Sequence, residues 1–175
     1  MRALVRLSAL ILGAAIVLAA AGCSENSAPR HAPRVQTING NEPLQSDVVT
    51  SEGGVIEDEV IVEIWNTPHD PVLDLYGTPF NAVWLERYEI VFESDEAIPP
   101  VSGALGWHVD TSRVMSGSIV IVPAAIKIEA PLVSLRDGGV IQTTARITFF
   151  GRETGSDEEV RFSTVLQVNF ANWAD

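Results

Sequence analysis

Apolar and polar residues alternate with a period of two along most of the chain after residue 44, which is typical of half-buried β-strands. Residues 60–65 form one such segment, with Val60, Val62 and Ile64 on the same face. In the next, Trp84, Glu86, Tyr88, Ile90 and Phe92 are expected on one face, and Arg87, Glu89, Val91 and Glu93 on the other. The pattern therefore predicts a sheet protein.

Two long alternating segments near the C-terminus predict a hairpin. Residues 145–150 and 162–170 flank the polar, glycine-containing stretch 151–159, which is suited to a turn. Residues 47–51 predict a short early strand. The apolar run 116–122, stopped by Pro123, predicts a strand that is buried on both faces or lies at a sheet edge. One helical turn is expected at 131–135.

These elements predict an all-β fold, a single immunoglobulin-like antiparallel β-sandwich over residues 44–175. The segment 101–110, "VSGALGWHVD", is expected to be a loop whose Trp107 packs against the end of the sandwich. Ser102, His108 and Asp110 occur together there, but closeness in sequence does not make a catalytic triad.

The first 23 residues have the layout of an export signal. Arg2 and Arg6 precede sixteen uncharged residues, Leu7 to Gly22, an apolar run too short for a comfortable membrane span. Small residues then precede Cys23, the one cysteine of the chain. This arrangement resembles the lipobox of bacterial lipoproteins, although Ala20 stands where the family usually has leucine. The alternatives are an ordinary cleaved signal peptide and an uncleaved membrane helix.

The lipobox resemblance implies cleavage between Gly22 and Cys23 and attachment of diacylglycerol to the Cys23 sulfur, with acyl chains such as palmitate. Several acyl chains hold a protein on a bilayer durably. Ser24, rather than aspartate, follows the cysteine, which by the same resemblance favours the outer membrane of a Gram-negative bacterium. Residues 23–43 are rich in Ser, Asn, Pro and Gly and are expected to form a lipidated flexible tether after the signal peptide 1–22.

The charge of the chain excludes one class of partner. The sequence holds 11 basic and 23 acidic residues, and loss of residues 1–22 removes two arginines, leaving a formal charge of −14. Nucleic-acid affinity depends on cationic side chains that release counterions. We therefore expect no nucleic-acid binding.

The residues available for catalysis or metal binding are few. A blue-copper site requires a cysteine as well as histidines, and Cys23 is assigned to lipid, so neither that site nor a structural zinc site is expected. His31 falls in the tether, leaving His69 and His108. No nucleophile elbow, Ser-x-x-Lys motif or phosphate loop occurs. We expect no cofactor and no enzymatic activity, and we regard calcium binding by the acidic loops as the weaker alternative to their solvation.

The most distinctive non-strand segment is residues 66–81, "NTPHDPVLDLYGTPFN", which contains three prolines. Such a stiffened loop either packs back on the core or binds a partner. The candidate binding residues are His69, Asp70, Asp74, Tyr76 and Phe80, together with Trp107.

Several segments resemble a group of bacterial lipoproteins with an immunoglobulin-like β-sandwich domain and no established activity. They are "SDVVTSEGG" (46–54), "LERYEIVFESD" (85–95), "ARITFFGRETGSDEEV" (145–160) and "VNFANWAD" (168–175). The resemblance implies a fold and an envelope location, and no catalytic residue.

The sequence thus favours a non-enzymatic, lipid-anchored envelope protein that binds an envelope protein partner or has a structural role. The alternative is a ligand-binding module for calcium or carbohydrate that uses acidic and aromatic loops. A tryptophan or tyrosine ring suits stacking on a sugar, although such rings more often pack in a core.

Overall fold

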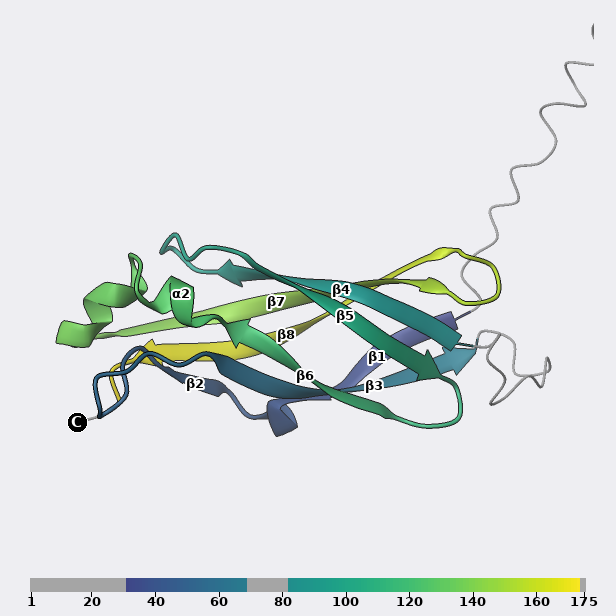
Figure 1. Cartoon of the computed structure of the whole chain (residues 1–175), viewed down its shortest axis with the longest axis horizontal. Coiled ribbons are helices and arrows are strands. Elements are labelled where there is room, and N and C mark those ends of the chain that lie inside the picture. The colour runs from purple at the N-terminus through teal and green to yellow at the C-terminus, as the bar shows by residue number, and fades with distance from the viewer. Residues whose placement is uncertain (1–30, 69–81, 174–175) are drawn as a thin grey trace, which may run out of the picture.

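The structure, a computed structural model, describes residues 31–68 and 82–173. Within them the chain forms two stacked β-sheets (Figure 1), so the predicted all-β sandwich arrangement is confirmed. The three-stranded sheet has the order β1 (His31–Ile38), β3 (Asp58–Pro68), β6 (Met115–Val122). The five-stranded sheet has the order β2 (Leu44–Asp47), β8 (Glu159–Ala171), β7 (Val140–Glu153), β4 (Ala82–Glu93), β5 (Val101–Asp110).

The pairing is antiparallel except at one edge, where the short strand β2 runs parallel to β8. This departs from the fully antiparallel sandwich that the sequence predicts. Three short helical segments complete the described part: the 3-10 turn η1 (Asn39–Asn41), α2 (Ala124–Lys127) and the 3-10 helix η2 (Leu132–Asp137). The last contains most of the helical turn expected at 131–135.

The core lies between the sheets, where alternate residues of each strand face inward. Buried side chains on the three-stranded sheet include Val60, Val62, Ile64, Ile119 and Ile121; those on the five-stranded sheet include Tyr88, Ile90, Ile147, Phe149, Leu166 and Phe170. The predicted face of residues 60–65 is therefore confirmed, and β7 and β8 form the predicted C-terminal hairpin. β7 and β8 pair from Val140 and Ala171 to Arg152 and Glu159.

The residues of β4 lie on the predicted faces only from Arg87 onward. The register of β4 with both neighbours shifts between Leu85 and Arg87, which marks a β-bulge. Leu85 is consequently buried, and Trp84 and Glu86 are exposed, opposite to the predicted face for these two residues. Strict alternation in the sequence cannot reveal a bulge, because the extra residue exchanges the inward and outward positions on one side of it.

Two aromatic side chains join the sheets along the β5–β6 side. The Tyr88 ring lies over Gly103 and its hydroxyl donates a hydrogen bond of 3.0 Å to the Val120 carbonyl on β6. The Trp107 ring lies over Gly117, where an added Cβ would stand 2.4 Å from the ring. The glycines thus leave the space that these two rings occupy.

The predicted tether 23–43 is wrong for its second half, because β1 and η1 lie within residues 31–41. β1 contains little apolar surface and includes Pro33, features that favour a loop when the segment is considered alone. It is ordered by pairing with β3 along its whole length, and proline is tolerated because β1 is an edge strand. The folded domain therefore includes His31, ahead of the predicted start at residue 44.

Three other local predictions have different outcomes. The expected loop 101–110 is wrong, because these residues form β5, whose burial alternates from Val101 to Val109. The early strand predicted over 47–51 is displaced, since β2 ends at Asp47. The apolar run 116–122 lies in β6, which is an edge strand of its sheet. This is one of the two positions that the sequence predicts for it.

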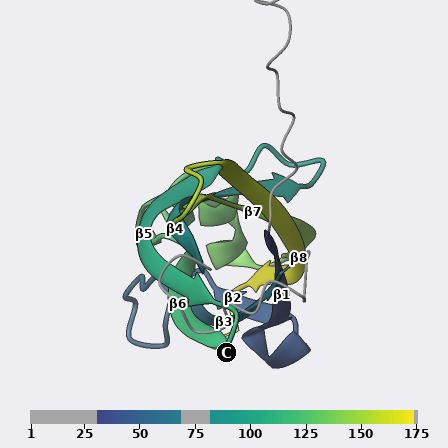
Figure 2. The ribbon, with the colours of Figure 1, turned by 90° about the vertical axis from the view of Figure 1, so that its right-hand side faces the viewer.

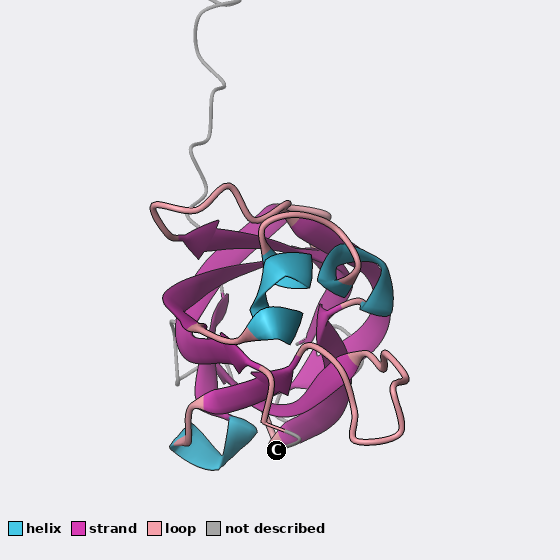
Figure 3. Cartoon of the chain, turned by 90° about the vertical axis from the view of Figure 1, so that its left-hand side faces the viewer, coloured by secondary structure: helices cyan, strands magenta, loops and turns pink. Residues whose placement is uncertain are grey.

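A buried cation closes one end of the sandwich, where α2 and η2 lie across the opening between the sheets (Figure 3). The Lys127 side chain is fully buried; its Nζ lies 2.9 Å from the Asp58 carboxylate and donates a hydrogen bond of 2.7 Å to the Asp47 carbonyl. Ser46 donates to Asp58 at 2.6 Å. In the part of the chain that is described, no helix is long and apolar enough to cross a membrane.

Candidate functional site

The outer face of the five-stranded sheet contains an aromatic ring between two guanidinium groups. Phe150 on the central strand β7 is paired with Arg87 on β4 and with Arg161 on β8. Directly paired residues on neighbouring strands project to the same face. The Arg87 and Arg161 guanidinium carbons accordingly lie 3.7 and 5.3 Å from the centre of the Phe150 ring, within the range of cation–π attraction.

A second aromatic row lies beside the first, on the far side of the β4 bulge. Trp84 is paired with His108 on β5 and with Arg152 on β7. Its ring is 6.4 Å from that of His108, and Trp84 as a whole is 44% exposed. We call the outer surface formed by Trp84, Arg87, Phe150, Arg152 and Arg161 the arginine–aromatic face.

Carboxylates surround most of these arginines. Arg87 pairs with Glu89, and Arg152 lies between 3.4 and 4.0 Å from Asp157, Glu159 and Glu86. Arg161, by contrast, has no ion pair in the described residues. Exposed pairs of this kind contribute little to stability, with a median near ~0–1 kcal/mol. They do fix the direction of the guanidinium groups, which a binding surface requires.

Apolar side chains continue the same face along the strands. Val91, Arg146 and Val165 occupy one cross-strand row, and Val91 and Val165 are 55% and 50% exposed. Arg146 pairs with Glu93 at 2.6 Å. A groove of about 330 Å³ lies at the hairpin end of this surface, between Glu86, Phe150 and Arg161. Arginine and aromatic residues beside exposed aliphatic ones make up the composition typical of protein interfaces.

The outer face of the three-stranded sheet contains a different arrangement. Trp65 on β3 is paired with Arg34 on β1, and these two residues line an open groove of about 480 Å³ with Val35, Gln36 and Val114. We call it the Trp65 groove. β6 begins at Met115, which is paired with Ile64, so no residue of β6 is paired with Trp65 on that side.

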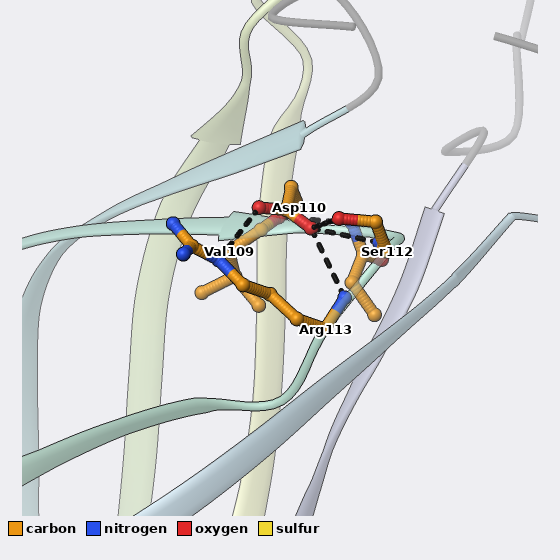
Figure 4. A network of polar contacts seen from close by, with 5 residues as sticks. Val109, Asp110, Ser112 and Arg113 are labelled. Carbon is orange, nitrogen blue, oxygen red and sulfur yellow. Dashed lines mark hydrogen bonds and ion pairs between the residues drawn. The ribbon is translucent and has the colours of Figure 1, made fainter. Parts of the chain in front are cut away.

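The turn that brings Val114 to the Trp65 groove is held by Asp110 (Figure 4). One Asp110 carboxylate oxygen accepts hydrogen bonds from the Ser112 amide at 2.7 Å, the Ser112 hydroxyl at 2.6 Å and the Arg113 amide at 3.2 Å. The other lies 3.3 Å from the Arg113 Nε. An aspartate that binds the backbone two and three residues ahead stabilises a tight turn.

Among the residues that the structure describes, Tyr88 and Asp110 have shifted pKa values. Partial burial by itself would raise the pKa of Asp110, but the Ser112 hydrogen bonds, the Arg113 charge and the Arg113 amide together lower it below the ordinary value. Burial raises the pKa of Tyr88; its hydrogen bond to the Val120 carbonyl opposes this, and the charges of Glu59 and Glu57 add to the increase.

Of the six residues predicted to bind a ligand, the structure describes only Trp107. His69, Asp70, Asp74, Tyr76 and Phe80 lie outside the described residues, as do Gly22 and Cys23. Trp107 lies on β5, partly buried against the core and over Gly117, so its ring already contacts protein on one face. Residues 102 and 108 are six positions apart on one strand, about 20 Å, and therefore form no triad with Asp110.

His31 is not in a tether but buried, and its backbone amide donates to the Glu153 carboxylate at 2.8 Å. Among residues 31–68 and 82–173, no three His, Cys, Asp or Glu side chains come close enough to hold a metal ion. Asp58, in the acidic stretch 57–59, forms an ion pair with Lys127.

Sequence reasoning identified neither outer surface. Alternation places Arg87 on the opposite face of its strand from Tyr88, but the strands that flank Phe150 follow only from the strand order and register. The sequence predicts that Trp65 lies on a strand but assigns it no role in binding. A search for arginine and aromatic residues on the outward positions of neighbouring strands is the signal that would have indicated both.

No protein-family model and no curated protein matches the chain. Among solved structures, it is similar to the solution structure of a putative late embryogenesis abundant protein, with a TM-score of 0.46 and 12% sequence identity. The alignment covers 98% of this chain and 90% of the other. At this level the likeness carries no argument about function.

Proposed function

We propose that the chain is a lipid-anchored envelope protein without enzymatic activity that binds a protein partner through its arginine–aromatic face. The single observation that carries the proposal is the cross-strand row in which Phe150 lies between Arg87 and Arg161 on an exposed sheet face. Nothing else in the described fold requires these three residues on a solvent-facing surface.

The side chains of the arginine–aromatic face are ordered before a partner binds, and they leave apolar surface exposed to water. Arg87 is stacked on Phe150 and paired with Glu89, so its side-chain entropy is already reduced before a partner binds. Trp84 and Val91 present apolar surface beside it. A partner that covers these rings removes apolar area from water and strengthens the cation–π contacts by desolvation.

The proposed membrane anchor is compatible with this face remaining accessible. The His31 amide bond to Glu153 holds the start of β1 beside the β7–β8 hairpin. Eight residue steps separate Cys23 from His31, a reach of at most about 28 Å if fully extended. The sandwich would then stand with the hairpin end toward the bilayer and the Lys127 end away from it, leaving both outer sheet faces open to the sides.

Site-specific photocrosslinking in the native envelope tests the proposed interface. A photoreactive residue at Val91 or Val165 is expected to give a discrete protein adduct, and the matched control at Ile61, which is 61% exposed on the other sheet, is expected to give none. Repeatable adducts at Ile61 alone, or the absence of adducts at all three positions, would contradict the proposed interface.

A Cys23→Ala variant tests the anchor separately. We expect it to lose its acyl mass and to leave the membrane fraction, whereas a Ser24→Ala variant, which keeps the cysteine, retains both. If Cys23→Ala protein keeps its acyl mass or still fractionates with membranes, the assignment of Cys23 as the lipid site is wrong, whatever the crosslinks show.

A further inference from the structure

The Trp65 groove differs in charge from most of the molecular surface. The whole chain has a formal charge of −12, yet the five residues that line the groove include Arg34 and no carboxylate. Among the residues that the structure describes, Arg34 makes no ion pair and its side chain makes no hydrogen bond. Six other described arginines and lysines have an ion pair or a cation–π contact. The groove therefore contains an uncommitted guanidinium in an acidic protein.

The side chains that line the groove suit a ring-shaped ligand. Trp65 is the one aromatic residue among the lining residues, and its ring belongs to an open sheet face. Val114 supplies an aliphatic contact on one side, while Arg34 and Gln36 supply polar hydrogens on the other. A volume of about 480 Å³ is within the range of small-ligand sites.

This combination of side chains selects a chemical class. A sugar ring has one face made of C–H groups, which stacks on an indole, and an edge of hydroxyl groups, which accept hydrogen bonds from an amide or a guanidinium. A carboxylate on the same ring would pair with Arg34 through two parallel N–H···O bonds. Two phosphates, as in a nucleotide, would meet only a single cation here.

The structural support of the groove also favours binding. Two of its sides come from β1 and β3, which are paired from His31 and Pro68 to Ile38 and Val62. The bulge of β1 between Val35 and Thr37 places Gln36 outside the regular ladder. The third side is the turn held by Asp110, so the wall formed by Val114 is fixed before any ligand arrives. We propose that the Trp65 groove binds an acidic saccharide, with the sugar ring on Trp65 and its carboxylate on Arg34.

Calorimetry with the full-length protein in detergent micelles tests this site. The probes are tri-galacturonic acid, its methyl ester, which lacks the charge, and a glutamate-rich peptide, which lacks the ring. We expect the acid to bind, and the ester to bind about tenfold more weakly, the ratio that corresponds to ~1.4 kcal/mol. Binding of the peptide with no binding of either saccharide would contradict the proposal in favour of an acidic protein segment.

Variants separate the two proposed contacts. Trp65→Ala should weaken both saccharides at least about tenfold, whereas Arg34→Gln should weaken only the acid and make it equal to the ester. Trp173→Ala is the matched control, because it removes an exposed tryptophan that belongs to neither surface; its affinity should stay within about twofold. An unchanged affinity in Arg34→Gln, which alters only an exposed side chain, would overturn the assignment even if Trp65→Ala is poorly folded.

Discussion

The two outer faces of the sandwich use the same pair of residue types in different surroundings. Phe150 lies on a central strand with an arginine paired on each side, so both of its edges are covered. Trp65 also lies on a central strand, but only Arg34 is paired with it, because β6 begins one residue too late to supply a second neighbour. One row is closed by cations, and the other opens into a groove.

The difference shows that strand ends, as well as residue types, decide what an aromatic residue on a sheet can do. On the arginine–aromatic face, Arg87 and Arg152 are paired with carboxylates, and binding would depend on a broad covered area. In the Trp65 groove, one cation and one ring remain available to a small ligand. The following predictions separate the two faces, beginning with the change expected to affect both.

The largest effect is expected from Lys127→Met. This variant should lower the stability of the sandwich that supports both faces, and so weaken binding at each. The variant leaves the partly buried Asp58 carboxylate and the Asp47 carbonyl without their cation, and breaking a fully buried pair costs about 3–5 kcal/mol, so we expect a loss toward the lower end of this range. Denaturant unfolding measures the loss. The double variant Lys127→Met/Asp58→Asn should recover a large part of it, and a double variant as unstable as the single one would show that the ion pair is not the cause.

Phe150→Ala should affect the arginine–aromatic face alone. It removes the ring that holds Arg87 and Arg161, and two exposed cation–π contacts correspond to about 1–2 kcal/mol. We expect crosslinking from Val91 to be lost and saccharide affinity to be unchanged. Ile61→Ala on the other sheet is the control, with a stability change within about 0.5 kcal/mol. Loss of saccharide binding in Phe150→Ala would mean that the faces are not independent.

Tyr88→Phe tests the join between the two sheets. Losing the hydrogen bond to Val120 should cost about 1 kcal/mol. Since the folded state raises the pKa of Tyr88, its contribution is present below the unfolded value of about 10 and is lost as the pH rises through the folded value. Thermal melting between pH 8 and pH 11 should therefore fall less steeply in Tyr88→Phe than in the parent protein; parallel curves would contradict this role.

The smallest effect is expected from Asp110→Asn, which should act on the Trp65 groove. Because the folded state lowers the pKa of Asp110, its contribution is present above the unfolded value of about 3.9 and is lost as the pH falls through the folded value. The exposed pairing with Arg113 limits the effect to less than about 1 kcal/mol. We expect the variant to remove part of the acid-induced loss of melting temperature and to reduce saccharide affinity while leaving the crosslinks intact.

Periodicity predicted the strands in which one face is buried and the other is wetted, such as the hairpin of β7 and β8. It failed where tertiary pairing compensates for weak local preference. β1 has few apolar residues and a proline, and it is ordered because β3 pairs with it. β5 alternates from Val101 to Val109, but its two glycines, Gly103 and Gly106, favour a loop. The Tyr88 ring occupies the space over Gly103, a contact that only the folded structure shows.

The predicted site residues and the observed surfaces hardly overlap for a similar reason. Segments rich in prolines and aromatics attract attention in a sequence, as residues 66–81 do, although residues 66–68 belong to β3 and the rest lie outside the described residues. The two surfaces described above instead combine residues from separate segments of the chain. Trp84 and Arg161 on one surface are 77 positions apart, and Arg34 and Val114 on the other are 80 positions apart. No local window contains them.

The sequence alone determined the all-β class, the inward residues of most strands and the acidic charge, because these depend on composition and on a two-residue period. Only the tertiary structure decided which strands are neighbours, where the register shifts and where a strand begins. Those features place Arg87 and Arg161 on either side of Phe150 and leave Trp65 with an open flank. Cross-strand neighbours are set by pairing over long sequence distances, and alternation contains no information about them.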